Sequence, residues 1–389
     1  MEPPPRLATI DILSRLVGFD TTSRNGNLDL IGWIRDYLAT HGIAARLSFD
    51  PTGTKANLHA LIGPAVDGGL AFSGHVDTVP VDGQSWSSDP FALRVEHGRA
   101  YARGACDMKG FVSSALAAVP DLQLLPLARP VHLFISFDEE TTCDGARILA
   151  ADVSAHGPVP ATCVVGEPSS MLPIIAHKGR LAVRGTVRGR AGHSSQPDLG
   201  VNAVHAAAEA IAHLAAEARR LAAEGTRVAG FDPPHSTVHV GLLSGGTILN
   251  IIPERAEFEL EWRTVPGDDA DRELERLRAH LAADTERWMR AVDPATGIDL
   301  EPLSVLPPLA IEPTHPLVAA VKHAAGANAE GKVSYGTEAG IFQGAGIATV
   351  VCGPGNIAQA HKADEWIALD QLDRCDRFLR RMAETLVRP

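Results

Sequence analysis

The segment SGHVDTVP (residues 73–80) follows the apolar run GGLAF, so a strand is expected to end at this point. His75 and Asp77 stand two residues apart, and residues i and i+2 of an extended chain project to the same side. An imidazole beside a carboxylate serves as a structural hydrogen bond, as a proton relay, or as a metal ligand with its orienting partner. The choice among these depends on which other acids and histidines converge on His75.

Length and charge narrow the class of protein. The chain has 389 residues, of which 45% are hydrophobic and 21% are charged. That length exceeds one ordinary core and suits two domains, or one large α/β domain with an insertion. The net charge of −12 argues against a nucleic-acid-binding protein, which needs a basic face. It favours a site that gathers carboxylates around cations.

The sequence indicates neither a membrane span nor export. No apolar run approaches the ~20 residues that a membrane-spanning helix needs. The start MEPPPRLATIDILSRL lacks an uninterrupted apolar signal core before a small-residue cleavage site. The five cysteines are odd in number and have no CxxC spacing, which is typical of a reduced protein. We therefore expect a cytoplasmic protein.

Strands and helices alternate through the first part of the chain. Apolar strands are expected over 56–63, 69–75, 131–136 and 161–168, and a helix over 107–122. This alternation predicts an α/β fold with a mainly parallel sheet covered by helices, and its ligand site lies beyond the carboxyl ends of the strands. Acids and a histidine stand at such ends: His75, Asp77, Asp138, Glu139, Glu140 and Glu167.

The pattern changes near residue 178. Two alternating strands, two long helices and two further strands follow in the order β-α-β-β-α-β, which is the ferredoxin-like arrangement. The second of these helices is expected to run unbroken over 268–292. We predict three segments: a first catalytic part over 1–177, an inserted α+β domain over 178–306, and a second catalytic part over 307–389.

The acids in FDEE (137–140) follow a strand too apolar to be exposed, so they need partners. Asp107 stands at the start of the predicted helix, where it is either a plain N-cap or a site residue. Glu167 ends a strand, and His361 lies in a loop after a late strand. Two imidazoles with carboxylates suit Zn²⁺, and also Co²⁺ or Mn²⁺. Four ligands would make a closed structural site, whereas five with a shared carboxylate indicate two metal ions.

Five motifs in order carry a family resemblance over essentially the whole chain: SGHVDTVP, RGACDMKG, FDEE, VVGEP and AHKADEW. They resemble the M20 metallopeptidase family of dizinc amidohydrolases. The resemblance implies that His75 and Glu167 hold one zinc ion and that Glu140 and His361 hold the other. It implies further that Asp107 bridges the two ions.

The same resemblance assigns the remaining residues of the catalytic part. Asp77 is expected to orient His75. Glu139 is expected to act as the general base and then as the general acid. The peptide bond between Asp107 and Met108 is expected to be cis, which is unusual for a non-proline bond.

Within the family, GTEAGIFQ (336–343) and CGPGNIAQAHKADEW (352–366) are similar to the acetylornithine deacetylases. That similarity implies hydrolysis of N2-acetyl-L-ornithine to L-ornithine and acetate, a step of arginine biosynthesis. The alternatives are a deacylase of another N-acyl amino acid such as succinyl-diaminopimelate, a dipeptidase, or a metal-binding protein without turnover. The intact FDEE argues against the last, because a protein that only binds metal needs no spare base beside its ligand.

The insertion contributes three more residues by resemblance. His193 is expected to meet the developing oxyanion, although on its own it reads as a loop histidine that caps the nearby helix. Asn250 and Arg263 are expected to hold the α-carboxylate of the substrate, for which the planar guanidinium of arginine is well shaped. Family members of this kind pair through the insertion, so we expect a homodimer in which His193 serves the opposite subunit.

Overall fold

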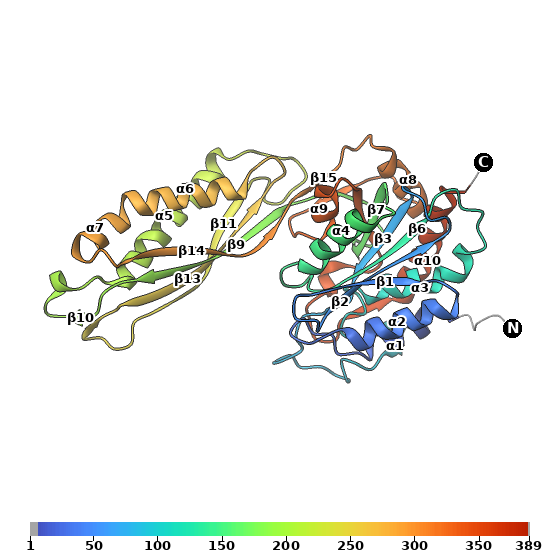
Figure 1. Ribbon diagram of the computed structural model, residues 1–389, viewed down its shortest axis with the longest axis horizontal. Helices are drawn as coiled ribbons and strands as arrows, with labels where there is room; N and C mark the ends of the chain where they lie inside the picture. Colours follow the sequence, from blue (N-terminus) through green and yellow to red (C-terminus); the bar gives the residue numbers. More distant parts are fainter. Residues whose placement is uncertain (1–6, 388–389) are drawn as a thin grey trace. The chain divides into compact units, whose positions relative to one another are not determined.

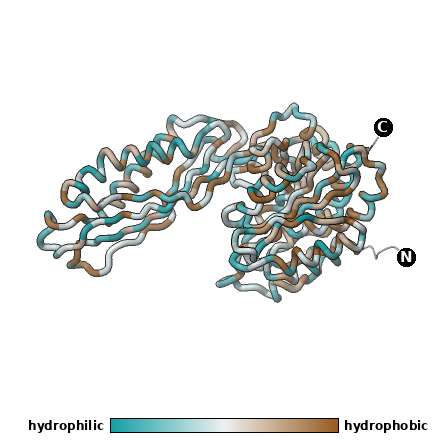
Figure 2. Tube along the Cα trace, viewed as in Figure 1, coloured by the Kyte–Doolittle hydropathy of each residue, from teal (hydrophilic) through white to brown (hydrophobic). Residues whose placement is uncertain are grey.

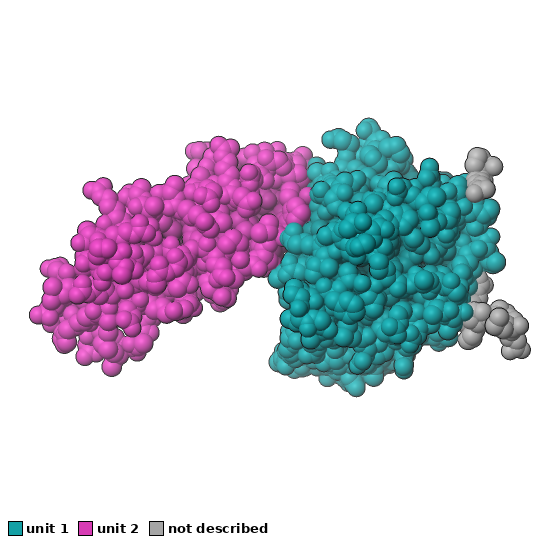
Figure 3. All heavy atoms as spheres, viewed as in Figure 1, with its two compact units in different colours: residues 1–176, 309–332, 337–389 teal, residues 177–308, 333–336 magenta. Residues whose placement is uncertain are grey.

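The computed structural model describes residues 7–387, which form two compact units (Figure 3). Unit 1 consists of residues 7–176, 309–332 and 337–387, and unit 2 consists of residues 177–308 and 333–336. The short segment 333–336 therefore belongs to unit 2, whereas the sequence pattern had placed it with the second catalytic part. In the described part of the chain, no helix combines the length and the apolar composition that crossing a membrane requires.

Unit 1 is built around a mixed sheet with a parallel centre (Figure 1). The sheet runs in the order β1 (Ala45–Phe49), β2 (Ala56–Ile62), β6 (Val131–Ser136), β3 (Leu70–His75), β7 (Thr162–Pro168), β17 (Ala348–Gly353), β8 (Ile174–His177) and β15 (Leu309–Ala310), with β16 (Gly331–Val333) paired to β8. The four central strands, β6, β3, β7 and β17, are parallel, and the pairs β1–β2, β2–β6 and β17–β8 are antiparallel. The predicted α/β class is confirmed.

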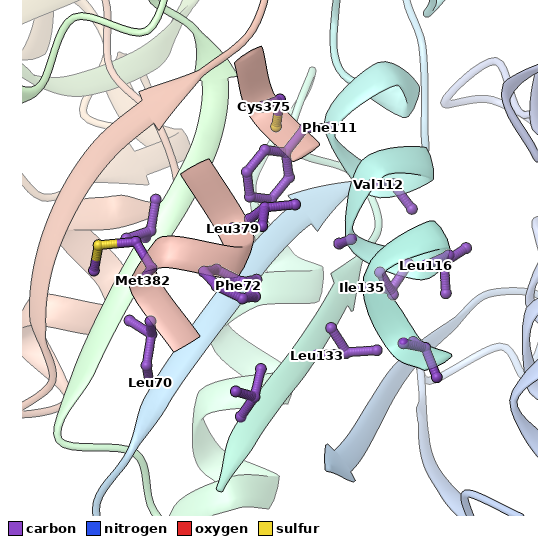
Figure 4. Close-up of a cluster of buried hydrophobic side chains, with 14 of the residues drawn as sticks. Leu70, Phe72, Phe111, Val112, Leu116, Leu133, Ile135, Cys375, Leu379 and Met382 are labelled. Atoms are coloured by element: carbon purple, nitrogen blue, oxygen red, sulfur yellow. The ribbon is translucent and has the colours of Figure 1, made fainter. Parts of the chain in front are cut away.

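Helices cover both faces of this sheet because its central strands are apolar on both sides. They are α1 (Thr9–Val17), α2 (Leu28–Thr40), α3 (Lys109–Leu122), α4 (Asp144–His156), α8 (Pro316–Ala325), α9 (Ala339–Gly344) and α10 (Leu369–Glu384). Every residue of β3 and of β6 is buried. Phe72 and Leu133 of the sheet share one core with Phe111 of α3 and Leu379 of α10 (Figure 4). A small sheet of β4 (Arg94–Glu96), β5 (Arg99–Tyr101) and β18 (Trp366–Ala368) and the 3₁₀ turn η2 (Ile357–Gln359) complete the unit.

Unit 2 is an antiparallel sheet covered by helices, in the strand order β11-β13-β9-β14. Its elements are β9 (Gly179–Arg188), β10 (Gly192–His193), η1 (Pro197–Leu199), α5 (Ala203–Glu224), β11 (Thr237–Gly245), β12 (Ile251–Ile252), β13 (Arg255–Thr264), α6 (Ala270–Ala283), α7 (Thr285–Val292) and β14 (Gly297–Leu306). Alternate strand residues such as Phe258 and Trp262 are buried in one cluster with Leu214 of α5 and Leu277 of α6. The four long strands and the covering helices follow the predicted β-α-β-β-α-β order.

The prediction of one unbroken helix over residues 268–292 is wrong. The structure has two helices there, α6 ending at Ala283 and α7 beginning at Thr285, with Asp284 between them. Glu286, in the first turn of α7, is buried and accepts the N–H of Ile298 at 2.7 Å. This contact ties α7 to the start of β14, and the sequence periodicity does not reveal it.

Candidate metal centre

The parallel register brings the ends of three strands to one edge of the sheet. His75 is the last residue of β3 and is paired with Ser136 at the end of β6, and Ser73 of β3 is paired with Val165 of β7. Carboxyl ends of parallel strands therefore coincide, and the residues that follow them meet. Glu167 and the turn with Glu139 thus reach His75 from the two neighbouring strands.

Asp107 lies between the two histidines. Its Oδ1 is 3.2 Å from Nε2 of His75, and its Oδ2 is 3.4 Å from Nε2 of His361. On the outer sides, His75 Nε2 is 3.7 Å from Glu167 Oε1, and His361 Nε2 is 2.9 Å from Glu140 Oε2. Each oxygen of one carboxylate thus faces a different imidazole, which is the arrangement that a bridging ligand needs.

Asp107 is not the cap of a helix. Helix α3 begins at Lys109, and Met108 occupies the N-cap position without a side-chain hydrogen bond. The Asp107–Met108 peptide bond is cis, as the family resemblance implied. Of the two roles open to Asp107 from the sequence, the geometry is that of a site residue.

The donor set fits two metal ions. Ligand atoms of His75, Glu139 and Glu167 lie within 4.8 Å of one another, and so do those of His75, Asp107 and Glu140. Glu167 Oε1 is buried and, within the described residues, accepts no hydrogen bond. Buried carboxylate oxygens without a partner are costly, and a cation satisfies them. Imidazole with carboxylate is the set that Zn²⁺, Co²⁺ or Mn²⁺ accepts.

Burial and mutual charge shift the protonation of the cluster in the metal-free chain. Burial, with the charge of Asp107, raises the pKa of Glu140 to about 7, and burial raises the pKa of Glu139 and of Glu167 well above their usual range. Hydrogen bonds with Asp107 and Glu140 raise the pKa of His361 to about 10. Metals bind only deprotonated ligands, so loading this cluster must release protons.

Asp77 connects the end of β3 to the turn after β6. Nδ1 of His75 is 3.0 Å from the backbone oxygen of Asp77 and 3.4 Å from its Oδ1. The Asp77 carboxylate also accepts the backbone N–H groups of Glu139 and Glu140, at 3.1 and 3.2 Å, and the hydroxyl of Ser23 at 2.7 Å. Asp77 therefore fixes the positions of His75, Glu139 and Glu140 relative to one another.

Two buried carboxylates beside the centre were given no role by sequence reasoning. Glu338, in GTEAGIFQ, is completely buried and accepts the hydroxyls of Ser73 and Ser136, both at 2.6 Å. Glu365, in AHKADEW, is 1% exposed and accepts the backbone N–H of Asp107 at 3.0 Å. In the sequence, each of these acids only stands within a motif that also contains apolar residues. The contacts that give Glu338 and Glu365 their roles join segments far apart in the chain, so the local sequence does not reveal them.

The three residues predicted in the insertion do not gather at one place in unit 2. His193 ends β10, and the next residue, Ser194, donates its N–H to the backbone oxygen of Asn250 at 3.1 Å. Arg263 lies near the opposite end of β13, where it pairs with Glu261 at 3.0 Å. The eight residue steps from Arg255 to Arg263 along β13 span roughly 27 Å at about 3.4 Å per step. His193 and Asn250 are therefore neighbours, and Arg263 is separated from them by most of a strand.

Comparison with known proteins agrees with this fold and centre. The model of peptidase family M20/M25/M40 matches residues 71–385. The solved M20 family metallo-carboxypeptidase Sso-CP2 of Sulfolobus solfataricus is similar, with 20% identity, a TM-score of 0.75, and coverage of 97% of this chain and 99% of that one. Aminopeptidase PepT of Bacillus cereus ATCC 10987 is similar with 19% identity, a TM-score of 0.73, and coverage of 97% and 98%.

The YXEP protein of Bacillus subtilis, a dinuclear metal-binding peptidase of the M20 family, covers 97% of this chain and 97% of its own, with 16% identity and a TM-score of 0.65. At these identities the structures show a shared fold, and the family match covers most of the chain. The paired histidines, the shared aspartate and the surrounding glutamates suit the dinuclear centre typical of that family. This chain is a metallohydrolase of peptidase family M20/M25/M40.

Proposed function

We propose that this chain is a cocatalytic dizinc amidohydrolase that hydrolyses the acyl amide of an N-acyl amino acid. The observation that carries the proposal is the placement of two adjacent glutamates. The ligand atom of Glu139 lies within 4.8 Å of those of His75 and Glu167, and that of Glu140 lies within the same distance of those of His75 and Asp107. Neighbouring carboxylates thus face both halves of one centre, so that one can serve as ligand and the other as base.

In this proposal His75 and Glu167 would hold one zinc ion, Glu140 and His361 would hold the second, and Asp107 would be the ligand shared by both. When bound, the ions supply Lewis acidity to the acyl carbonyl and lower the pKa of water.

Glu139 accepts the proton of the attacking water and delivers it to the nitrogen of the leaving amine. The water oxygen bonds to the acyl carbon, and the C–N bond then breaks to give a carboxylate and an amine.

His193 is suited to donate a hydrogen bond to the oxyanion. The backbone N–H of Ser195 lies 3.2 Å from Nδ1 of His193 and can only donate, so in the neutral ring Nδ1 accepts and Nε2 carries the proton. The Ser195 hydroxyl lies 2.7 Å from the same nitrogen. His193 is exposed, so its Nε2–H is free to meet a substrate oxygen.

We further propose a homodimer that pairs through unit 2. Strand β11 is an edge of the sheet, and the exposed fractions of Leu242, Leu243 and the nearby Leu249 are 62%, 56% and 98%. Figure 2 shows hydrophobic residues in the loop beyond β11. Edge strands need cover, and exposed apolar residues beside one favour a protein partner.

A second copy also explains the distribution of the insertion residues. One subunit holds His193 and Asn250 about a strand's length from Arg263, farther apart than an N-acyl amino acid extends. Two subunits can bring His193 and Asn250 of one chain to the substrate that Arg263 of the other chain binds by its α-carboxylate. The proposed small-molecule substrate would then lie in a site completed by both chains.

The substrate that we propose is N2-acetyl-L-ornithine, on the resemblance carried by residues 336–343 and 352–366. The test is a panel of acetylornithine, succinyl-diaminopimelate, other N-acetyl amino acids and dipeptides, assayed on zinc-loaded enzyme with and without chelator. We expect chelator-sensitive release of acetate, with the largest kcat/KM on acetylornithine. A larger kcat/KM for a dipeptide or for succinyl-diaminopimelate would assign that compound as the substrate in place of acetylornithine. No hydrolysis of any compound by the zinc-loaded enzyme would refute the proposed activity.

A further inference from the structure

Glu365 is a buried acid that the proposed chemistry does not use. It follows the candidate ligand His361 by four residues and stands directly before β18. Its side chain is 1% exposed, and it belongs to neither group of candidate metal ligands. Its role must therefore come from its hydrogen bonds.

Both carboxylate oxygens of Glu365 accept donors from one short segment, residues 103–107. Oε1 accepts the backbone N–H groups of Cys106 at 2.8 Å and of Asp107 at 3.0 Å. Oε2 accepts the backbone N–H of Gly104 at 3.0 Å and Nη1 of Arg103 at 2.8 Å. Charge-assisted hydrogen bonds of this kind are short and directional, so the three from backbone N–H groups fix the backbone from which the Asp107 side chain projects, and the fourth adds the Arg103 side chain.

The segment before Asp107 also donates hydrogen bonds to the loop that carries His361. Arg103 is 1% exposed, and its Nη1 donates to the backbone oxygen of Lys362 at 3.3 Å as well as to Glu365. The N–H of Ala102 donates to the backbone oxygen of Glu365 at 3.1 Å. The segments with Asp107 and with His361 are thus held as one body, although more than 250 residues separate Glu365 from Asp107 in sequence.

We propose that Glu365 is the positioning residue that sets the Asp107 carboxylate between His75 and His361. Without it, the loop of Asp107 and the loop of His361 would each adopt their own conformation, and the two oxygens of Asp107 would no longer face two imidazoles. This inference deepens the proposed function and rests on the centre holding two metal ions.

The test variant is Glu365→Gln, and Asp364→Asn is the matched control. Glutamine has nearly the same size, but its amide NH₂ would face two donors in place of an oxygen that accepts from them. Asp364 is the adjacent acid of the same loop, and it accepts from the N–H and hydroxyl of Ser87 at 2.9 and 2.8 Å, away from Asp107. The measurements are zinc bound per chain against free zinc, the absorption spectrum of the cobalt-loaded protein, the melting temperature, and kcat and KM.

We expect Glu365→Gln to weaken zinc binding by about 10–100-fold, as the loss of a residue that orients ligands does. Its cobalt spectrum should change, because the geometry of the ligands changes, and kcat should fall more than KM rises. Asp364→Asn should keep the wild-type zinc affinity and spectrum. A lower melting temperature with unchanged zinc affinity and cobalt spectrum would overturn the proposal, since it would show a merely structural role.

If Glu365→Gln does not fold, Glu365→Asp keeps the proposal testable. Aspartate keeps the charge but is one methylene shorter, so it cannot reach the same donors. It should shift the cobalt spectrum in the same direction, and an unchanged spectrum would again overturn the proposal. Failure of the proposed function looks different: a wild-type protein that binds two metal ions but hydrolyses no substrate of the panel would remove the activity and leave the role of Glu365 intact.

Discussion

Asp77 accepts the backbone N–H of Glu139 at 3.1 Å, so the residue expected to orient one ligand also holds the turn that carries the proposed base. The second carboxylate oxygen of Asp77 takes the N–H of Glu140 at 3.2 Å and the hydroxyl of Ser23 at 2.7 Å. Burial alone would raise the pKa of Asp77, but its bonds to His75, Ser23 and Glu139 hold that pKa below the usual range. Asp77 therefore stays ionised and able to accept all of these bonds.

Loss of metal should distinguish the candidate ligands from Asp77. His75→Ala and His361→Ala each remove a direct donor, so each variant should bind less than two zinc ions per chain and lose activity. Asp77→Ala leaves every ligand in place but frees the turn after β6, so we expect zinc affinity to fall by about 10–100-fold. Metal analysis after dialysis measures both effects, and full zinc occupancy in His75→Ala and His361→Ala would contradict the ligand set.

Glu139→Gln should keep both metal ions and lose turnover. Glutamine has nearly the same size as glutamate but cannot accept a proton from water, and loss of a general base costs about 10²–10⁴-fold in rate. The measurement is kcat beside zinc content on the same preparation. A kcat near the wild-type value with two zinc ions bound would exclude Glu139 as the base.

Arg263→Ala should raise KM for substrates with a free α-carboxylate. Loss of one buried charge-assisted pair costs on the order of 2–5 kcal/mol. A substrate with that carboxylate amidated should be poor for the wild type and little affected by the substitution.

Arg184→Ala is the matched control for Arg263→Ala. Arg184 lies on β9 and pairs with Glu259 at 2.8 Å, much as Arg263 pairs with Glu261 at 3.0 Å, but it has no proposed contact with substrate. Its KM should stay at the wild-type value. If Arg263→Ala raises KM equally for the free and the amidated substrate, Arg263 does not bind the α-carboxylate.

Activity should return when two inactive homodimers exchange subunits. Glu139→Gln and His193→Ala should each be nearly inactive, since an oxyanion donor is worth about 10²–10³-fold in kcat. Random exchange puts half of the molecules in heterodimers, and one site of each heterodimer has an intact Glu139 with an intact His193 from its partner chain. About a quarter of the wild-type activity should appear. Mass analysis should verify that the subunits have exchanged. If they have and no activity returns, His193 does not act across the dimer.

The free energy of unfolding should fall as the pH falls below about 6.5, through two buried histidines. Nε2 of His59 lies 3.1 Å from Nδ1 of His132. Burial and the charges of His132 and Arg46 lower the pKa of His59 to about 3, and burial lowers the pKa of His132 to about 4. The unfolded chain takes up protons near pH 6.5 and the folded chain does not, so each histidine should remove about 2 kcal/mol of stability between pH 7 and 5.

Urea unfolding at pH 7 and 5 measures this effect. The control is the double variant His59→Gln/His132→Gln, which lacks both titrating rings and keeps the other groups that titrate in this range. The wild type should lose more stability than the variant over the same interval. An equal loss in the two proteins would show that the histidine pair is not responsible.

The order of elements and the edge that carries the site were readable in the sequence. His75, Glu139 and Glu167 each follow an apolar run, and runs of that kind between helices form parallel strands whose carboxyl ends coincide. The alternation of the later segments likewise indicated an antiparallel sheet in the insertion. These features depend on local periodicity, which a single sequence contains in full.

What required the tertiary structure was the set of contacts between distant segments. The sequence left Asp107 open between a helix cap and a site residue, and its position between His75 and His361 depends on loops that Glu365 joins. Nor could periodicity reveal the break at Asp284 or the separation of His193 from Arg263 along unit 2. Such features are decided by the hydrogen bonds and packing of whole segments against each other, and no local pattern along the chain records which distant partner satisfies a buried carboxylate.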